Sequence, residues 1–268
     1  MKFFLNNFAV KSVFWIAMML LISCYQQKEG CLDIHATNFD ASADVNCCCD
    51  YPRLQLNFIH KTNTKLYNSD DTLSNDLGQA YKINSFSIYM SGFSFKTANG
   101  KIISTTDTIR IPSKTDSIVL NKDIALVRPI TNNILLGRLI QTDDFTEIDF
   151  NIGVPQAANQ ADISRIPESS NLSTQPDSMF TPNLGYISIR YTISDLAGNL
   201  KELRIYDVIP LQFNLLLTNK IAENTCLQLE IDHSYLMHDI DILNDSNILI
   251  ENKIKQNFSK ACTLKSCN

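Results

Sequence analysis

The dominant pattern in this 268-residue chain is an alternation of apolar and polar residues in short segments. Side chains two residues apart share one face of a β-strand, so the alternation predicts strands with one buried face. Polar connections separate these segments, and no strong amphipathic helix lies between them. The chain is therefore predicted to be all-β, with an antiparallel β-sandwich or barrel. The expected strands occupy residues 54–60, 83–95, 146–154, 185–195, 200–208, 211–217 and 226–232.

Three features depart from this alternation. Gly92 interrupts the expected strand 83–95 and predicts a β-bulge. Residues 247–261 place apolar side chains on one face at helical spacing, which predicts a short C-terminal helix. Residues 155–184 are polar, contain prolines and are too long for a hairpin. A loop of this length without secondary structure of its own is usually functional or mobile.

The N-terminal segment has the pattern of a processing signal. Two lysines and no acid accompany an apolar run, residues 13–22, that is too short to span a bilayer comfortably. The run ends in LISC, which resembles the lipobox of bacterial lipoproteins: a small residue for the peptidase, then a thiol that carries diacylglycerol. We expect a lipoprotein signal peptide over residues 1–23, a lipid on Cys24 and a polar tether over residues 24–30. The alternative is an ordinary signal peptide with a chance cysteine.

Charge and hydropathy restrict the partners of the mature chain. The formal net charge is −5 at pH 7, and removal of the lysine-bearing signal peptide makes it more negative. The phosphates of nucleic acids repel such a chain, so no nucleic-acid partner is expected. No other apolar run approaches membrane-spanning length, so the lipid on Cys24 would be the membrane attachment. The predicted location is the bacterial cell envelope, anchored to the outer membrane and either periplasmic or surface-exposed.

The remaining cysteines predict disulfides, because an exported chain enters an oxidising compartment. Adjacent cysteines seldom bond to each other without strain, so the run 47–49 is expected to reach more distant partners. We predict that Cys31 pairs with one of the three and that another pairs with a cysteine nearer the C-terminus. Such bonds would staple residues 31–52, a module too short to build a core. The candidates are Cys31, Cys47, Cys48, Cys49, Cys226, Cys262 and Cys267.

The same module carries side chains suited to metals. Calcium takes six to eight oxygen ligands, but the spacing here is not that of an EF-hand, and Asx residues also cap turns. A copper or zinc site on the thiolates of residues 47–49 is less favoured than disulfides in an oxidising compartment. The candidate calcium ligands within residues 31–52 are Asp33, Asn38, Asp40, Asp44, Asn46 and Asp50.

Histidines supply the second candidate metal site. His60 ends the first expected strand of the main domain, while His233 and His238 follow the last one. In a closed or sandwiched sheet the first and last strands often lie close together. Imidazole is a common copper ligand, so His60 with His233 or His238 is the candidate copper site, with a methionine as a further ligand. The alternative is that these histidines are structural or exposed. His35 is a poorer candidate, because it lies in the cysteine-rich module.

Sequence motifs for catalysis are absent. We find no nucleotide-binding loop, no GxSxG and no HExxH. Acidic residues are scattered over polar strand faces and loops, where a solvated surface explains them. The chain is therefore predicted not to be an enzyme.

Two parts of the chain resemble known families. Residues 31–52 resemble a short cysteine-bounded motif that recurs in surface and secreted proteins of Bacteroidota. Residues 54 to about 258 resemble the MbnP-like domain, named for the methanobactin-associated periplasmic copper protein. The matching stretches, in order, are LQLNFIH, YKINSFSIYMSGFSF, FTEIDFNIGVP, Asn159 and PDSMFTPNLGY. We take residues 54–268 as the main domain.

The resemblance implies a β-rich fold and, for some family members, a copper site. That site combines histidines with a tryptophan oxidised to kynurenine by a diheme peroxidase-like partner. The family pattern has two tryptophans where this chain reads MFTPNLGY, residues 179–186, so both positions are empty. Trp15 is the single tryptophan and would leave with the signal peptide. A kynurenine copper site is therefore not expected here.

Two functional hypotheses follow. The first is a non-enzymatic envelope lipoprotein with an MbnP-like domain that binds a metal ion, copper being the candidate, or a partner protein. Its partner would be a diheme peroxidase-like protein or an outer-membrane complex. The second is a metal-free structural or accessory subunit of a cell-surface complex. Convergence of at least two of His60, His233 and His238 separates the two hypotheses.

Overall fold

The computed structural model describes residues 26–114, 116–141, 143–168, 170–173, 179–218 and 222–267. The chain divides after Asp50 into two compact units, and each is described by itself. The expected signal peptide, Cys24 and Trp15 lie outside the described residues. Within the described ranges, no helix has the length and apolar character needed to cross a membrane.

The N-terminal unit has two short strands and little core. β1 (Glu29–Gly30) pairs in parallel with β2 (Val45–Asn46), and turns connect them. Cys31 and Ala36 are buried, and a disulfide joins Cys31 to Cys49. The expected pairing of Cys31 with one member of the cysteine run is confirmed.

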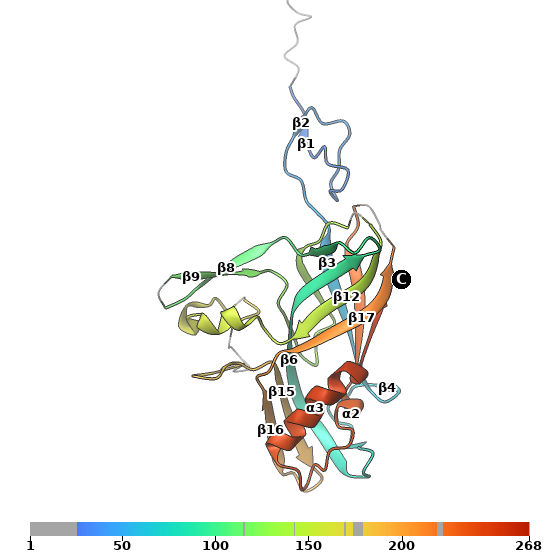
Figure 1. The fold of residues 1–268 in the computed structure, drawn as a ribbon, viewed down its shortest axis with the longest axis vertical. Helices are drawn as coiled ribbons and strands as arrows, with labels where there is room; N and C mark the ends of the chain where they lie inside the picture. The colour runs from blue at the N-terminus through green and yellow to red at the C-terminus, as the bar shows by residue number, and fades with distance from the viewer. Residues whose placement is uncertain are drawn as a thin grey trace, which may run out of the picture. The chain divides into compact units, whose positions relative to one another are not determined.

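The main unit is a sandwich of two sheets (Figure 1). Five long strands of the first sheet lie in the order β16 (Leu200–Ile205), β15 (Ile189–Asp195), β6 (Ala80–Thr97), β12 (Phe145–Ile152) and β17 (Ile209–Leu217). Short strands β5 (Leu73–Ser74), β7 (Ile102–Ser104) and β10 (Ala125–Val127) also pair with β6. Every pairing within this sheet is antiparallel, as the alternation predicts.

Strand β6 is the central strand of this sheet because it pairs with two long strands along its length. Its N-terminal half pairs with β15, and its C-terminal half pairs with β12. Gly92 lies in the second half with a φ of 70°, and the register with β12 shifts between Asp149 and Asn151. A left-handed backbone conformation is accessible to glycine at low cost, which explains the residue at this position. The expected bulge is confirmed.

The second sheet brings the two ends of the domain together. Its strands lie in the order β11 (Asn133–Arg138), β3 (Arg53–Thr62), β18 (Thr225–Asp232) and β19 (Cys262–Ser266), and β4 (Lys65–Leu66) pairs with β3. The expected proximity of the first and last long strands is confirmed. However, β3 and β18 run parallel, whereas the other pairs of this sheet are antiparallel. Alternation records which face is buried but not strand direction, so the sequence pattern could not reveal this.

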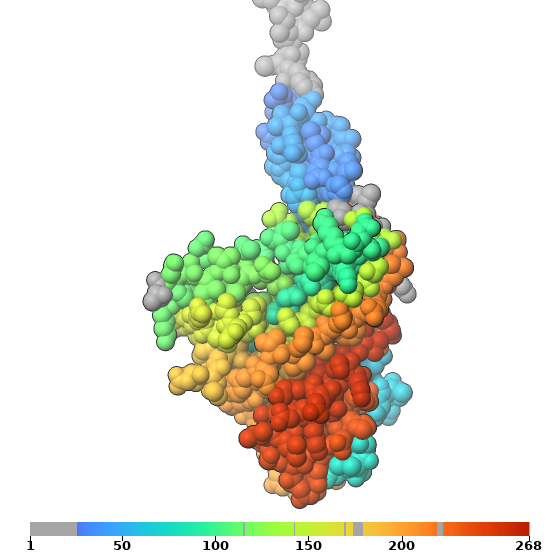
Figure 2. All heavy atoms as spheres, viewed as in Figure 1, coloured from blue at the N-terminus to red at the C-terminus, as the bar shows by residue number. Residues whose placement is uncertain are grey.

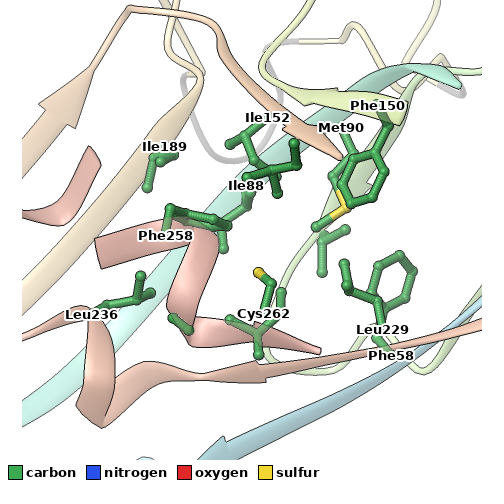
Figure 3. Close-up of a cluster of buried hydrophobic side chains, with 14 of the residues drawn as sticks. Phe58, Ile88, Met90, Phe150, Ile152, Ile189, Leu229, Leu236, Phe258 and Cys262 are labelled. Atoms are coloured by element: carbon green, nitrogen blue, oxygen red, sulfur yellow. The ribbon is translucent and has the colours of Figure 1, made fainter. Parts of the chain in front are cut away.

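The core lies between the sheets and is closed by a helix. Figure 3 shows Phe58 and Leu229 facing Met90 and Phe150, with Phe258 and Cys262 packed alongside. Helix α3 (Asn247–Ala261) is capped by Ser246, whose Oγ accepts a hydrogen bond from the backbone N–H of Leu249. Its buried apolar face consists of Ile250, Ile254, Phe258 and Ala261. In Figure 2 the atoms of α3 and its C-terminal neighbours (red) cover one side of the sandwich. The predicted helix is confirmed.

A second apolar cluster lies under the segment expected to be a loop. Within residues 155–184 the structure has two 3₁₀ turns, η1 (Gln156–Gln160) and η2 (Ile163–Arg165), and a short strand β13 (Phe180–Thr181), which pairs with β14 (Gly185–Tyr186) just beyond the segment. They pack beside the hairpin of β8 (Thr108–Pro112) and β9 (Ser117–Asn121). Figure 2 shows the hairpin (green) against the two turns (yellow-green). Buried side chains such as Ala158, Leu172 and Met179 anchor the segment, which explains why its described parts are structured.

The second disulfide corrects the expected pattern. Cys226 pairs with Cys267, while Cys47, Cys48 and Cys262 are free. The prediction that a second member of the cysteine run reaches the C-terminal cysteines is therefore wrong. The reason is strand register: Leu227 of β18 pairs with Ser266 of β19, which makes Cys226 and Cys267 neighbours across the sheet. Cys262 is buried in the core.

Candidate metal site

Strand pairing brings His60 and His233 together. His60 lies near the end of β3 and is paired in register with Ile231 of β18. One residue later, at Asp232, β18 ends, and His233 begins the short helix α2 (His233–Leu236). Asp232 makes this turn sharp, because its carboxylate accepts hydrogen bonds from the backbone N–H groups of Ser234 and Tyr235. The cap therefore fixes the backbone position from which the His233 side chain extends.

A continuous hydrogen-bonded chain crosses the sandwich at this point. Nδ1 of His60 lies 3.0 Å from Nε2 of His233, and Nδ1 of His233 lies 2.6 Å from the hydroxyl of Tyr191. Tyr191 belongs to β15 in the opposite sheet. Nε2 of His60 is buried and has no hydrogen-bond partner among the described residues. The three side chains, which we call the His60–His233–Tyr191 chain, thus link both sheets and leave one ring nitrogen unsatisfied.

Aromatic rings surround the pair of His60 and His233 and shield it from water. The ring of Phe86 lies 4.2 Å from that of His233 and 4.9 Å from that of His60, measured between centroids. The ring of Tyr67 lies 5.5 Å from that of His233, and its hydroxyl donates to the backbone carbonyl of Ile83. His233 is fully buried. Electrostatic and ligand interactions at such a site are therefore little screened by water.

Burial keeps both imidazoles neutral. It lowers the pKa of His60 to about 4. The nearby backbone of Thr131 is the one influence that opposes this shift, although it forms no hydrogen bond of normal geometry with the ring. It also lowers the pKa of His233 well below the usual value, and the neighbouring His60 adds to this effect. Burial likewise raises the pKa of the Tyr191 hydroxyl. Neutral imidazole is the form that binds metals, so the pair is competent for coordination at neutral pH.

The geometry of the pair fits a metal with few ligands. Imidazole nitrogens lie about 2.0–2.1 Å from a bound first-row metal, so two of them are about 3.3 Å apart at a tetrahedral angle and about 4 Å apart in a linear arrangement. The observed 3.0 Å between the ring nitrogens of His60 and His233 would have to open by a few tenths of an ångström in the first case and by about 1 Å in the second. No cluster of three or more His, Cys, Asp or Glu side chains suited to a metal occurs among the described residues. The pair thus offers two ligands rather than a four-ligand protein cage, and its spacing is nearer to that of the bent arrangement.

The other candidate histidines lie elsewhere. His238 has a half-exposed side chain, with Nδ1 3.4 Å from a carboxylate oxygen of Asp76. His35, in the N-terminal unit, lies 3.1 Å from Asp33. The structure therefore resolves the choice between His233 and His238: His233 meets His60, and His238 does not.

Tyr191 is a site residue that sequence reasoning missed. The alternation of residues 185–195 predicts only that its side chain lies on the buried face of a strand. A buried tyrosine hydroxyl needs a hydrogen-bond partner, so its position alone indicates a polar group opposite. The sequence gives no sign that the partner is a histidine beyond the end of β18.

The oxygen-bearing side chains of the N-terminal unit cap turns. Asn38 donates to the carbonyl of Cys48 and accepts from the backbone N–H of Asp50. Asp33 accepts from the backbone N–H of His35, and Asn46 accepts from that of Leu32. Asp40 and Asp44 bind the ammonium and the backbone N–H of Lys28, respectively. Calcium binding by this unit stays a prediction.

The segment 179–186, where the family pattern has tryptophans, belongs to the second apolar cluster rather than to the histidine pair. Met179 and Tyr186 are buried there, and the Tyr186 hydroxyl donates to the carbonyl of Leu172. Gly185 has a φ of 93°, and Asn159 sits so close that a Cβ at Gly185 would meet its side chain at 2.5 Å. The carboxamide oxygen of Asn159 accepts from the backbone N–H of Tyr186. Glycine is thus required here by both conformation and space.

Comparison with known proteins agrees with this architecture. A search of curated proteins gave no match. The structure of MbnP from Methylosinus trichosporium aligns with a TM-score of 0.51, at 11% sequence identity, over 81% of this chain and 99% of that chain. At this identity the likeness shows a shared fold. The family model of MbnP matches residues 51–252, which is most of the chain. The chain therefore belongs to the MbnP family.

Proposed function

We propose that this chain is a non-enzymatic protein of the cell envelope that binds one copper(I) ion between Nδ1 of His60 and Nε2 of His233. The observation that carries the proposal is the 3.0 Å separation of these two nitrogens in a buried site. Burial keeps both rings neutral, and a soft monovalent cation is compatible with two imidazole ligands. The family relationship supports it, because the family is related to a methanobactin-associated copper protein.

Tyr191 would allow the ion to enter without expelling a proton from the site. A hydrogen bond between the two imidazoles requires a proton on one of the facing nitrogens. In the tautomer with that proton on Nε2 of His233, copper binding to both lone pairs requires the proton to move to Nδ1. The Tyr191 hydroxyl lies 2.6 Å from Nδ1 and can either donate or accept, so it orients the imidazole in both states. Bound copper would supply a redox-active, Lewis-acidic centre.

The copper affinity should be ordinary for a two-histidine site. Both tryptophan positions of the family pattern are empty in residues 179–186, so no kynurenine ligand is available. The ion should therefore be removed readily by a chelator. The two disulfides are consistent with an exported protein. We further propose that lipid on Cys24 holds the chain at the outer membrane, where a diheme peroxidase-like protein or an outer-membrane complex would be its partner.

Anaerobic titration of the purified chain with copper(I), in competition with a chromophoric chelator, tests the proposal. In a Cys47→Ser/Cys48→Ser background, which removes two thiols that would also bind copper(I), we expect one equivalent of copper to bind to the parent and none to His60→Leu, which replaces one ligand by an apolar side chain of similar size. The variant His35→Ala/His238→Ala is the matched control, because it removes the two exposed histidines, and it should bind as the parent does. Binding by His60→Leu at parental affinity would refute the assignment.

A metal-free accessory role is the second candidate. It is favoured by the complete burial of His233 and by the hydrogen bonds that already occupy both of its ring nitrogens. In that case the His60–His233–Tyr191 chain is a structural link between the two sheets. A parent protein that binds no copper in the titration, and shows the same unfolding midpoint with and without the ion, would support this role.

A further inference from the structure

The run of three cysteines contains two thiols that form no structural disulfide. Cys49 is bonded to Cys31, which leaves Cys47 half-buried and Cys48 exposed. The sulfur atoms of Cys47 and Cys48 lie 2.6 Å apart. This contact lies within the N-terminal unit and involves none of the residues of the histidine pair. Neither the copper site nor the structural disulfides account for it.

The backbone around the two thiols is fixed at every residue. The N–H of Cys47 donates to the carbonyl of Gly30 at the end of β1. The carbonyl of Cys48 accepts from the side chain of Asn38, which also accepts from the N–H of Asp50. The disulfide to Cys31 holds Cys49. The backbone that carries the two neighbouring thiols is therefore held in place by hydrogen bonds and a disulfide, unlike that of a free loop.

The backbone conformation of Cys48 is the second sign of a specialised site. Its φ is 58°, in the left-handed region that residues other than glycine rarely adopt. Such conformations persist only where the surroundings impose them, and they concentrate at functional positions. Here the hydrogen bond from Asn38 to the Cys48 carbonyl and the neighbouring disulfide impose it. The effect is to bring the side chains of two successive residues together.

The sulfur separation distinguishes a covalent bond from a metal site. Two thiolates bound to one tetrahedral metal ion, each about 2.3 Å from it, lie about 3.8 Å apart. A disulfide bond has a length of about 2.05 Å. The observed 2.6 Å is much nearer to the second value. The scaffold is thus set for the two sulfur atoms to bond to each other rather than to share an ion.

We infer that Cys47 and Cys48 form a reversible dithiol–disulfide couple, oxidised by exchange with a disulfide such as glutathione disulfide. The exposed Cys48 thiolate attacks one sulfur of the donor, forms a mixed disulfide and releases the first donor thiolate. Cys47 then loses its proton and attacks the sulfur of Cys48, which forms the Cys47–Cys48 bond and releases the second donor thiolate. Two electrons pass to the donor, which leaves as two thiols carrying the two protons.

The surroundings of the two thiols favour this order of events. The contact with Cys48, with the carboxylate of Glu29 adding to it, raises the pKa of Cys47 to about 11. Glu29 lies 3.8 Å from the Cys47 sulfur. Cys48 is the more exposed of the two, so it meets the donor disulfide first. An exposed disulfide between adjacent residues belongs to the labile class, in contrast to the structural bonds.

Titration of the purified full chain carrying Cys24→Ser, which removes the remaining cysteine, with glutathione buffers of increasing oxidised fraction tests this inference. After each equilibration, native alkylation followed by intact-mass measurement counts the accessible thiols. We expect two alkyl groups to disappear together in a single transition, with loss of two hydrogen atoms and no glutathione adduct. The Cys47→Ser variant should instead keep glutathione on Cys48, because no second thiol can resolve the mixed disulfide.

Cys262 provides an internal control, since it is buried and should be alkylated only after denaturation. Its protection in each variant also shows that the main unit is folded. Two findings would overturn the inference. One is that both thiols remain alkylated at the most oxidising ratio. The other is that fragment ions place Cys47 or Cys48 in a bond with Cys31, because the structural disulfide would then be the exchange partner.

Discussion

The histidine pair and the cysteine pair of this protein differ in how they are assembled. His60 and His233 are far apart in the sequence, are brought together by the pairing of β3 with β18, and are buried among aromatic rings. Cys47 and Cys48 are adjacent and lie at the surface of a unit with little core. Burial governs the chemistry of the first pair, because it suppresses charge. Contact between the two thiols governs that of the second. The first should therefore be coupled to folding and the second should not.

Acid stability should show the largest difference between the pairs. In the metal-free protein the pKa of His60 falls from 6.5 to about 4 on folding. The unfolded chain therefore binds more protons between these values, so the free energy of unfolding should fall as the pH drops through this window, by about 3 kcal/mol for His60 alone. Denaturant unfolding at a series of pH values measures it.

Variants separate this contribution from that of the carboxylates. His60→Leu should flatten the dependence between pH 6.5 and 4, whereas Cys47→Ser/Cys48→Ser should retain the parental slope. Carboxylates with lowered pKa values, such as Glu230 beside Lys61 and Lys265, act at lower pH and in all variants alike. An unchanged slope in His60→Leu would show that the histidine pair is not coupled to folding.

Tyr191→Phe should have an intermediate effect. It keeps the ring but leaves Nδ1 of His233 without its partner in a dry site, which should cost about 1–2 kcal/mol in the free energy of unfolding. Copper affinity should fall about tenfold if the hydroxyl orients the imidazole. Tyr186→Phe is the matched control, because it removes a buried hydroxyl that donates to Leu172 in the second cluster. Its stability should fall comparably, with unchanged copper affinity; equal losses of affinity in both variants would contradict the role of Tyr191.

Cys48→Ser should have the smallest effect. The side chain is exposed, so the free energy of unfolding should stay within about 0.5 kcal/mol of the parental value. Denaturant unfolding monitored by far-ultraviolet circular dichroism measures this. A loss of more than about 1 kcal/mol would mean that the thiol has a structural role, and the contrast with the histidine pair would disappear.

The sequence predicted those features that depend on local periodicity. Alternation located β3, β6, β12, β15 and β18, and helical spacing located α3 over Asn247–Ala261. It also indicated that His60 would approach a histidine from the end of the domain. Such predictions succeed because a strand or helix with one buried face must repeat its apolar residues at its own period.

Features that depend on register could not be read in the same way. The pairing of Cys226 with Cys267 follows from the alignment of β18 with β19, which no local pattern records. The same is true of Tyr191, whose partner lies in the opposite sheet. The choice of His233 over His238 depends on where Asp232 caps α2, a local detail that becomes decisive only once β18 is placed.

The parallel pairing of β3 with β18 has a consequence for the order of folding. Arg53, at the start of β3, binds Asn224, which is 171 residues further along the chain. During synthesis, the edge of β3 that pairs with β18 therefore has no partner until nearly the whole domain has been made. Contacts between such distant segments close slowly, because the entropy of loop closure must be overcome before the contacts form. The histidine pair is built on this junction, so it cannot form before β18 has been made and would be absent from any chain truncated before β18.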